Sequence, residues 1–562
     1  MAVGAGRVYV ERMTHAVPET WTLPWRGLGL SSNLSVADVP QPYRLLDESP
    51  GLFDYVEYSA PLSLEESKAH ASLFPEMWRR RQDVPVLFHP VHLNLWGPAL
   101  EPGQALRELD AHARAVESAW VGNDVGWWHV DGQPFPGYLY FTPPFNEAGL
   151  EACVSHALHV QRHLSRPLAL ENPAVLARRG QWHVLDFMAK LHARTGAPLL
   201  LDLGHLLSHQ LSAGLPLETG LDGFPLDQVI ELHIAGGVVT HRGPRSFYVD
   251  DHTQPVREEL FDLLASLIPR CPSLRAVTFE GDGHPPEVAR MSLRRLRQWV
   301  PAGARPPLTW RVPPAVAAVP PLTEDSQPWA LFDAGYAAAP VASVEDEAGT
   351  LADQDFRLAV VAEVLDREWP LTRLLLAGTR EGLAAFTGSK EYRKLFDAVA
   401  RTPGQAFASW AMRRLRESPD EGASAALTLE LLLPSLFTRR VPAPAPGQVG
   451  LMEDVRAGSL PVDLSELVHA ARAVRRHLTA RAWACGTLEL SGLDSLNQVA
   501  RRPGPGPWSF VARRRSGGPE VMSVPPALGE FLRMLAVRPM AEAEVTPGLL
   551  EEARGRGLLR RG

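Results

Sequence analysis

The segment 198-PLLLDLGH-205 decides the fold, because it joins an apolar run to polar side chains that can bind metal. A near-continuous apolar run is typical of a strand buried on both faces, as in a parallel sheet. The preceding segment, 182-WHVLDFMAKLHARTG-196, has apolar residues at helical spacing and ends in glycine. That pattern predicts a helix ending near residue 196. Helix and strand therefore alternate at this point of the chain.

Further apolar runs lie on both sides of this segment, at intervals of roughly 30–45 residues. The runs are 27-GLGL-30, 54-DYVEYS-59, 84-VPVLFHPVH-92, 119-AWVGND-124, 167-PLALEN-172, 229-VIELHIAGG-237 and 275-RAVTFEGD-282. Eight such βα units predict an α/β fold, a (β/α)8 TIM barrel. An open doubly wound sheet is the alternative, which is disfavoured because no glycine-rich phosphate loop follows the first strand.

Proline marks two seams, 301-PAGARPPLTWRVPPAVAAVPPLTED-325 and 441-VPAPAPGQVG-450. Both are typical of extended linkers or domain-edge loops. We therefore expect a barrel domain over residues 1–300 and a proline-rich linker over 301–325. A mainly helical domain is expected over 326–440, and an α+β or winged-helix-like domain over 450–562.

Composition limits the classes of partner. The net charge is −8, so nothing favours a nucleic acid or an anionic membrane as partner. No apolar run is long enough to span a bilayer, and the first residues do not resemble a signal peptide. The three cysteines, Cys153, Cys271 and Cys485, are scattered and form no CxxC pair. We expect a cytoplasmic protein without disulfides.

Metal-competent side chains follow several of the predicted strands, at the end where TIM barrels carry their chemistry. They are His89, Glu171, Asp202, His205, His233, Asp250, His252 and Glu280. Taken singly, a histidine in an apolar strand is more often a hydrogen-bonded core residue, and a carboxylate at a strand end is more often a cap or an ion-pair partner. Their coincidence at equivalent strand ends favours a metal site. Imidazole and carboxylate together suit zinc, manganese or iron.

These residues also carry a family resemblance. Their order is similar to that of the xylose-isomerase-like TIM-barrel superfamily. The chain resembles the DUF692 family, the multinuclear non-heme iron-dependent oxidative enzymes, still more closely. The resemblance covers about residues 25–290, and its motifs are 27-GLGLSSN-33, 170-LEN-172, 200-LLDLGH-205, 231-ELHIAGG-237 and 250-DDHTQPV-256.

The resemblance implies an oxidase that uses dioxygen to modify a side chain, often cysteine, of a ribosomally made peptide, as in RiPP biosynthesis. It implies two or three metal ions, with iron expected and zinc or manganese as alternatives. The implied ligands are the eight residues named above, and we expect Glu171, Asp202 and His233 to be essential for catalysis. The implied partners are a peptide substrate and a small partner protein.

The chain departs from the family pattern at two positions. The family usually has Ser-Asp/Glu-His-Leu after the fourth strand, whereas here the matching stretch is 122-GNDVGWW-128, with Val125 in the place of the histidine. One metal position is therefore expected to be empty, weakened, or completed by His92 or His129. The family also often has asparagine where this chain has His205.

Two other functions remain open at this point. A metal-dependent isomerase or phosphodiesterase of the wider superfamily is one, although such a sugar isomerase commonly needs a lysine near the metals. Lys68 and Lys190 fall in helix-like segments instead. A non-catalytic binding scaffold is the other, and its one support is Val125.

Residues 325–562 contain no catalytic constellation. Their end, 554-RGRGLLRR-561, is basic and could meet an acidic peptide, although a solvated tail is the simpler interpretation. We expect either a fused module that recruits the substrate or a helical packing domain that only stabilises the barrel.

Overall fold

The computed structural model of the chain describes residues 19–35, 37–137, 139–300, 302–303, 305–311, 320, 322, 327–336, 346–396, 401–438, 440–472, 504, 506–515 and 518–562. The chain divides into two compact units. The first comprises Met1–Phe332 and Ala342–Ala352, and the second comprises Asp333–Val341 and Asp353–Gly562. Most of the expected linker 301–325, and Cys485, lie outside the described residues.

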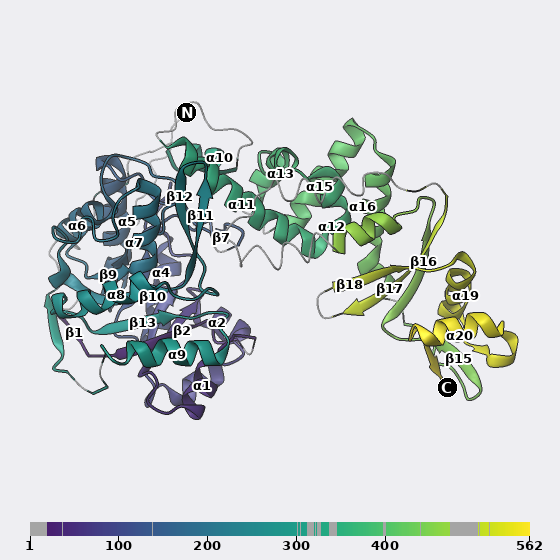
Figure 1. Cartoon of the computed structure of the whole chain (residues 1–562), viewed down its shortest axis with the longest axis horizontal. Helices are drawn as coiled ribbons and strands as arrows, with labels where there is room; N and C mark the ends of the chain where they lie inside the picture. Colours follow the sequence, from purple (N-terminus) through teal and green to yellow (C-terminus); the bar gives the residue numbers. More distant parts are fainter. Residues whose placement is uncertain are drawn as a thin grey trace, which may run out of the picture. The chain divides into compact units, whose positions relative to one another are not determined.

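The first unit is built on a closed barrel of parallel strands in the order β10-β13-β2-β3-β4-β5-β8-β9 (Figure 1). Each strand coincides with one of the eight apolar runs, so the predicted TIM barrel is confirmed. The strands are β2 (Gly27–Ser32), β3 (Tyr55–Ala60), β4 (Val86–Pro90), β5 (Val121–Asp124), β8 (Leu168–Glu171), β9 (Leu199–Asp202), β10 (Val229–Ala235) and β13 (Ala276–Glu280).

Helices connect the strands. They are α1 (Pro42–Glu48), α2 (Leu64–His70), α3 (Phe74–Arg80), α4 (Gly103–Ala115), α5 (Glu147–His163), α6 (Val184–Thr195), α7 (Leu203–Ala213), α8 (Glu258–Leu267) and α9 (Pro286–Leu296). The helix predicted over residues 182–196 is α6. It ends at Gly196, whose φ of 66° is left-handed and therefore favours glycine.

Apolar side chains fill the end of the barrel opposite to the polar strand ends. Tyr55, Leu87, Trp120 and Leu200 belong to this core. The short strands β1 (Thr20–Leu23) and β14 (Leu308–Arg311) pair antiparallel and add Trp21, Leu23 and Trp310 to the same core. Because side chains alternate along a strand, residues two positions beyond these core residues face the interior nearer the polar end.

An antiparallel hairpin follows β10. It consists of β11 (Gly237–Arg242) and β12 (Arg245–Asp250) and brings Asp250 back to the end of β10, because Gly237 and Asp250 are paired in register. A second, two-residue pair, β6 (His129–Val130) and β7 (Gln133–Pro134), lies in the loop after β5.

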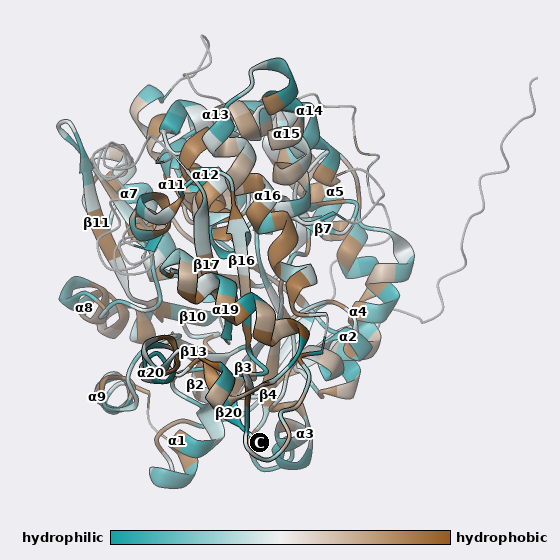
Figure 2. Ribbon diagram, turned by 90° about the vertical axis from the view of Figure 1, so that its right-hand side faces the viewer, coloured by the Kyte–Doolittle hydropathy of each residue, from teal (hydrophilic) through white to brown (hydrophobic). Residues whose placement is uncertain are grey.

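The region after the barrel is mainly helical, as predicted, and α16 is largely hydrophobic (Figure 2). Its helices are α10 (Gln327–Tyr336), α11 (Glu347–Glu368), α12 (Pro370–Leu376), α13 (Arg380–Thr387), α14 (Lys390–Arg393), α15 (Pro403–Glu417) and α16 (Glu421–Leu436). Within the part of the chain that the structure describes, no helix combines the length and the apolarity needed to cross a membrane.

The last part of the second unit contains two three-stranded sheets, in the orders β16-β17-β18 and β19-β15-β20. Its elements are β15 (Gln448–Leu451), β16 (Val455–Leu460), β17 (Trp508–Arg515), β18 (Gly518–Ser523), α19 (Pro526–Val537), β19 (Met540–Ala541), α20 (Pro547–Gly555) and β20 (Leu559–Arg561). Helix α19 packs on both sheets, and its Leu528, Phe531 and Leu532 are buried in their shared core. The winged helix remains a prediction.

Candidate metal centre

All eight predicted ligands lie at the carboxyl end of the barrel. Six of their side chains form a closed ring of contacts, to which His89 is attached through Glu171. On one side of the ring, His89 Nε2 lies 2.9 Å from Glu171 Oε2. Glu171 Oε1 lies 3.3 Å from His233 Nδ1, and the same nitrogen lies 3.7 Å from Glu280 Oε1. Glu171 and His233 therefore each face two partners.

The other side of the ring consists of residues from the hairpin and from α7. Glu280 Oε2 lies 3.7 Å from His252 Nε2, which lies 3.0 Å from Asp250 Oδ2. The same Asp250 oxygen lies 3.3 Å from His205 Nε2. His205 Nδ1 closes the ring, 3.6 Å from Glu171 Oε1.

The remaining predicted residue, Asp202, lies inside this ring and orients it. Its Oδ1 accepts a 2.5 Å hydrogen bond from His205 N and caps α7. The adjacent Asn172 pairs with the backbone of Asp202 through both ends of its amide, at 2.9 and 3.0 Å. The Asn172 carbonyl also accepts a 2.9 Å hydrogen bond from His205 Nδ1. His205 Nε2 is thereby turned toward the ring as a potential ligand.

Strand register explains why these distant residues meet. His233 on β10 is paired with Asp202 on β9, and Asp124 on β5 is paired with Glu171 on β8. Register partners in neighbouring parallel strands point to the same face of the sheet. In a closed barrel that face is the interior, so the side chains converge at its carboxyl end.

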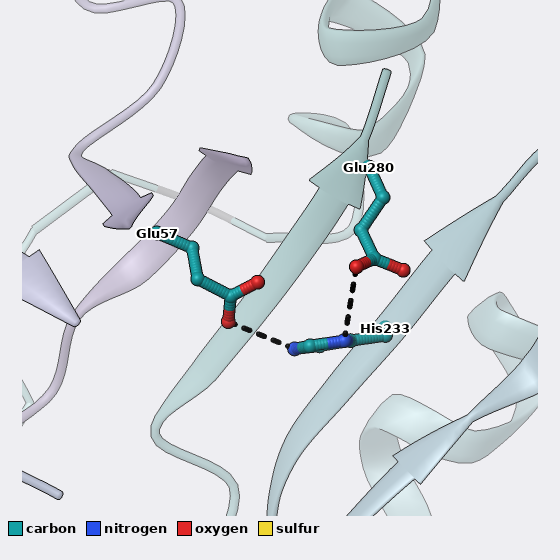
Figure 3. Close-up of side chains that lie close together, drawn as sticks. All are labelled: Glu57, His233 and Glu280. Carbon is teal, nitrogen blue, oxygen red and sulfur yellow. Dashed lines mark ion pairs between the residues drawn. The ribbon is translucent and has the colours of Figure 1, made fainter. Parts of the chain in front are cut away.

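Two further carboxylates belong to the cluster and were missing from the sequence-based list. Glu57 on β3 lies below His233, with its Oε2 3.0 Å from His233 Nε2. Figure 3 shows that Glu57 and Glu280 approach different nitrogens of the His233 ring. Asp124 lies 3.4 Å from His205 Nδ1. Both residues sit within the quoted apolar runs at inward-facing positions, which is the signal that could have identified them.

The electrostatics of the cluster favour a cation. Seven buried or nearly buried carboxylates face only four histidines. Six of them are Glu57, Asp124, Glu171, Asp202, Asp250 and Glu280, and the seventh is Glu231, whose Oε1 lies 3.5 Å from His233 Nε2. Burial and the neighbouring Glu171 raise the pKa of Asp124 to about 7, and burial raises the pKa of Glu280 to about 8. Burial lowers the pKa of His89, but the hydrogen bond to Glu171 and the charges of Glu171, Glu57 and Asp124 together outweigh it and raise the pKa to about 9. A divalent cation would offset this surplus of negative charge.

Several atoms of the cluster are buried without a hydrogen-bond partner, as expected of metal ligands. Asp202 Oδ2, Asp250 Oδ1 and both ring nitrogens of His233 are of this kind. The His233 nitrogens lie near carboxylates, but not at hydrogen-bonding angles. Buried polar atoms are rarely left unpaired, because their desolvation is costly. The residues present therefore fit bound metal ions.

Three overlapping groups of side chains have ligand atoms within 4.8 Å of one another. They are His89–Asp124–Glu171, Glu171–Asp202–His233 and Glu57–His233–Glu280. Glu171 belongs to two of the groups and His233 to two. Shared ligands of this kind suit a multinuclear centre.

Neither histidine proposed as a replacement at the Val125 position belongs to these groups. His129 Nε2 donates to Glu101 at 2.7 Å, and His129 Nδ1 accepts from Gly132 N at 2.9 Å. Both ring nitrogens of His129 are thus occupied away from the cluster. The ring of His92 lies against Trp128. Val125 is fully buried.

The part of the chain that forms the barrel is similar to several known proteins. The sequence model of the family described as "RiPP precursor modification enzyme MbnB/TglH/ChrH" matches residues 39–297. A UPF0276 protein of Caulobacter vibrioides is 28% identical over 266 residues, which are 47% of this chain and 90% of that protein. A UPF0276 protein of Rhizobium meliloti is 30% identical over 201 residues, which are 34% of this chain and 64% of that protein.

Among solved structures, a xylose isomerase domain containing protein from Salmonella typhimurium is 9% identical, with a TM-score of 0.30. The match covers 49% of this chain and 94% of that one.

Proposed function

We propose that the barrel of this chain belongs to the MbnB/TglH/ChrH family of RiPP precursor modification enzymes, whose model matches residues 39–297, and that it is a multinuclear non-heme iron oxidase acting on a peptide. The substrate is a ribosomally made peptide, the modified group is a side chain such as cysteine, and the oxidant is dioxygen. The observation that carries the proposal is the sharing of Glu171 and His233 between groups of ligands. A mononuclear site would not need shared ligands.

The residues that would hold the metal are those of the ring, together with His89 and Asp202. When bound, the iron ions supply the redox chemistry with dioxygen that the side chains alone lack. The chain itself positions ligands before substrate arrives: Asn172 sets the tautomer of His205, and the carboxylate of Glu57 lies 3.0 Å from His233 Nε2. The apolar core at the opposite end of the barrel keeps bulk water from reaching the metal centre through the barrel interior. Glu171 and His233 are themselves buried.

The alternative function, a sugar isomerase, would commonly need a lysine near the metals. Lys68 on α2 pairs with Glu65 at 2.7 Å, and Lys190 on α6 lies over the Trp182 ring. The other two lysines of the chain, Lys390 and Lys394, belong to the second unit. None of the four is among the side chains of the metal centre, which favours the oxidase.

Metal analysis tests the proposal. The chain should be purified without oxygen, and its metal content measured together with its Mössbauer spectrum. Two or more iron ions per chain, with a spectrum that changes on exposure to dioxygen, are expected. Zinc as the only bound metal would contradict the oxidase and favour a hydrolase.

We further propose that residues 325–562 recruit the peptide or take the place of a small partner protein. Among the described residues, every group of metal-competent side chains lies in the barrel. A region of this size without a metal centre among its described residues suits binding.

A further inference from the structure

Asp124 precedes Val125, the position at which the family resemblance leads us to expect a histidine ligand. Asp124 itself lies in the metal centre. Its side chain is only slightly exposed, and its ligand atom groups with those of His89 and Glu171. It also lies 3.4 Å from His205 Nδ1. The carboxylate therefore reaches the other ligands without any rearrangement of the chain.

The strand geometry explains why Asp124, rather than residue 125, enters the centre. Trp120 faces the barrel core, and a Cβ on Gly122 would meet His89 and Leu200 inside the barrel. Asp124 continues this alternation. Val125 N donates to the Glu171 carbonyl at 3.1 Å, which extends the β5–β8 pairing by one residue. The side chain of Val125 therefore points to the opposite side from that of Asp124.

Tyr140 holds Asp124 in this position. Its hydroxyl accepts a 2.7 Å hydrogen bond from Ala174 N and points its own hydrogen toward Asp124 Oδ1, 3.4 Å away. Gly126 leaves room for the Tyr140 ring, because a Cβ there would lie 2.5 Å from the ring. Residues 124, 126 and 140 thus form a consistent local arrangement around the carboxylate.

We propose that Asp124 is a metal ligand that takes the place of the absent imidazole, and that Tyr140 is its positioning residue. The resulting site has one imidazole, from His89, and two carboxylates, from Asp124 and Glu171. Such a ligand set is harder than one with two imidazoles and suits Mn²⁺ or Fe²⁺. The inference rests on the proposed function only in requiring that the barrel binds metal.

The test is a titration of the metal-free full chain with Mn²⁺, in which free Mn²⁺ is measured by electron paramagnetic resonance. Asp124→Asn preserves shape and removes the charge. It should bind one ion fewer per chain than the unaltered protein, or bind that ion more than about 100-fold more weakly, since loss of a residue that only supports a ligand already costs about 10- to 100-fold. Asp110→Asn is the matched control, because Asp110 in α4 is similarly buried but pairs with Ser165 and with no residue of the metal centre.

Two more variants complete the test. Asp124→His should keep the full number of ions, since it restores an imidazole at the same position. Tyr140→Phe should keep the number of ions bound per chain but lower the affinity for one of them by about 10-fold. Unchanged binding in Asp124→Asn would overturn the inference while leaving the metal centre intact. Absence of Mn²⁺ and iron binding in the unaltered chain would instead overturn the proposed function.

Discussion

Glu171 is the side chain on which the centre depends most, because its two oxygens face different histidines. Oε2 meets His89 and Oε1 meets His233. Replacing Glu171 with Gln or Ala should therefore lower the affinity for two metal ions at once, each by more than about 100-fold, and abolish activity. Asp202→Ala should likewise lose metal and activity.

The measurement is metal content per chain after anaerobic reconstitution, with circular dichroism as the check that the fold persists. Asp110→Asn serves again as the control that should retain metal. If both Glu171→Gln and Asp202→Ala bind as much metal as the unaltered chain, these residues are not ligands.

Val125 carries a second prediction at this scale. Because its side chain is fully buried and points away from Asp124, a histidine at this position would bury a polar ring on the side opposite to Asp124. Val125→His should therefore leave the metal content unchanged and lower the free energy of unfolding by about 1–3 kcal/mol. Urea unfolding together with metal analysis checks this. A gain of one tightly bound ion would contradict it.

The sequence predicted every residue of the ring, because the eight expected ligands lie at the ends of the predicted strands or in the loops after them and form an ordered set. It did not lead to Glu57 or Asp124. Glu57 stands inside an apolar run and Asp124 ends one, and a single carboxylate at either place is easily taken for part of the strand or for its cap. Identifying them requires the phase of the inward alternation, which depends on which residues fill the core, such as Tyr55 and Trp120.

At the scale of elements, the β11–β12 hairpin is held in place at its far end. Arg245 of β12 forms a bidentate ion pair with Asp346, whose side chain is almost fully buried. Asp346 also accepts a hydrogen bond from Gly349 N in the first turn of α11. The pair therefore fixes both the start of α11 and the strand that ends at the metal-centre residue Asp250.

Asp346→Asn should lower the free energy of unfolding of the first unit by about 2 kcal/mol, since it weakens an ion pair and a helix cap together. It should also weaken metal binding by about 10-fold by loosening the hairpin. Asp333→Asn is the control, because its ion pair with Arg393 is exposed and should contribute little. Thermal unfolding and Mn²⁺ titration measure both effects; equal values for the two variants would contradict this role of Asp346.

In the second unit, α16 supports the start of α12 through one buried carboxylate. Glu430 accepts hydrogen bonds from Leu371 N at 2.6 Å and Thr372 N at 3.0 Å. Burial outweighs these bonds and raises the pKa of Glu430 to about 7. The folded state therefore binds more protons than the unfolded state between about pH 4.5 and 7, and stability falls as the pH rises through this window.

Glu430→Gln should remove this dependence, because the amide does not titrate. For the unaltered chain, the contribution of Glu430 should decrease by up to about 3 kcal/mol between pH 4.5 and 7. Urea unfolding of the second unit at several pH values provides the measurement. The idea fails if the difference in stability between the variant and the unaltered chain is the same at pH 5 and pH 7.5.

Strands were easier to predict than the elements between them. A strand buried on both faces is a near-continuous apolar run, so each barrel strand can be recognised in the sequence. The hairpin β11–β12 does not, because its first strand is only half buried and includes Thr240, His241 and Arg242. The sequence therefore indicated a loop that carries Asp250 and His252. In the structure, the β11–β12 hairpin ends at Asp250, and His252 follows two residues later.

At the scale of the whole molecule, the first unit includes more than the barrel. Trp329 and Phe332 of α10 pack against Trp127, and Phe332 also lies against Phe135 and Phe141. A chain cut after about residue 320 would expose these aromatic rings. A cut after residue 352 retains them, together with Asp346, and is the better way to separate the two units.

A chain ending at residue 352 should remain folded and bind its full complement of metal, because every described ligand precedes that residue. If residues 325–562 recruit the substrate, the shortened chain should lose affinity for a candidate precursor peptide encoded beside the gene, by at least about 10-fold. The reason is that the peptide would then bind through the barrel alone, with less buried surface and fewer anchoring side chains.

Fluorescence anisotropy of the labelled peptide gives the affinity, mass spectrometry gives its conversion, and the full chain is the control for both. Equal affinity and conversion in the shortened and full chains would exclude the recruiting role. A shortened chain that unfolds or loses metal would support the packing alternative instead, in which the second unit only stabilises the barrel. The metal content measured beside the affinity separates these outcomes, because recruitment predicts loss of peptide binding while the centre stays loaded.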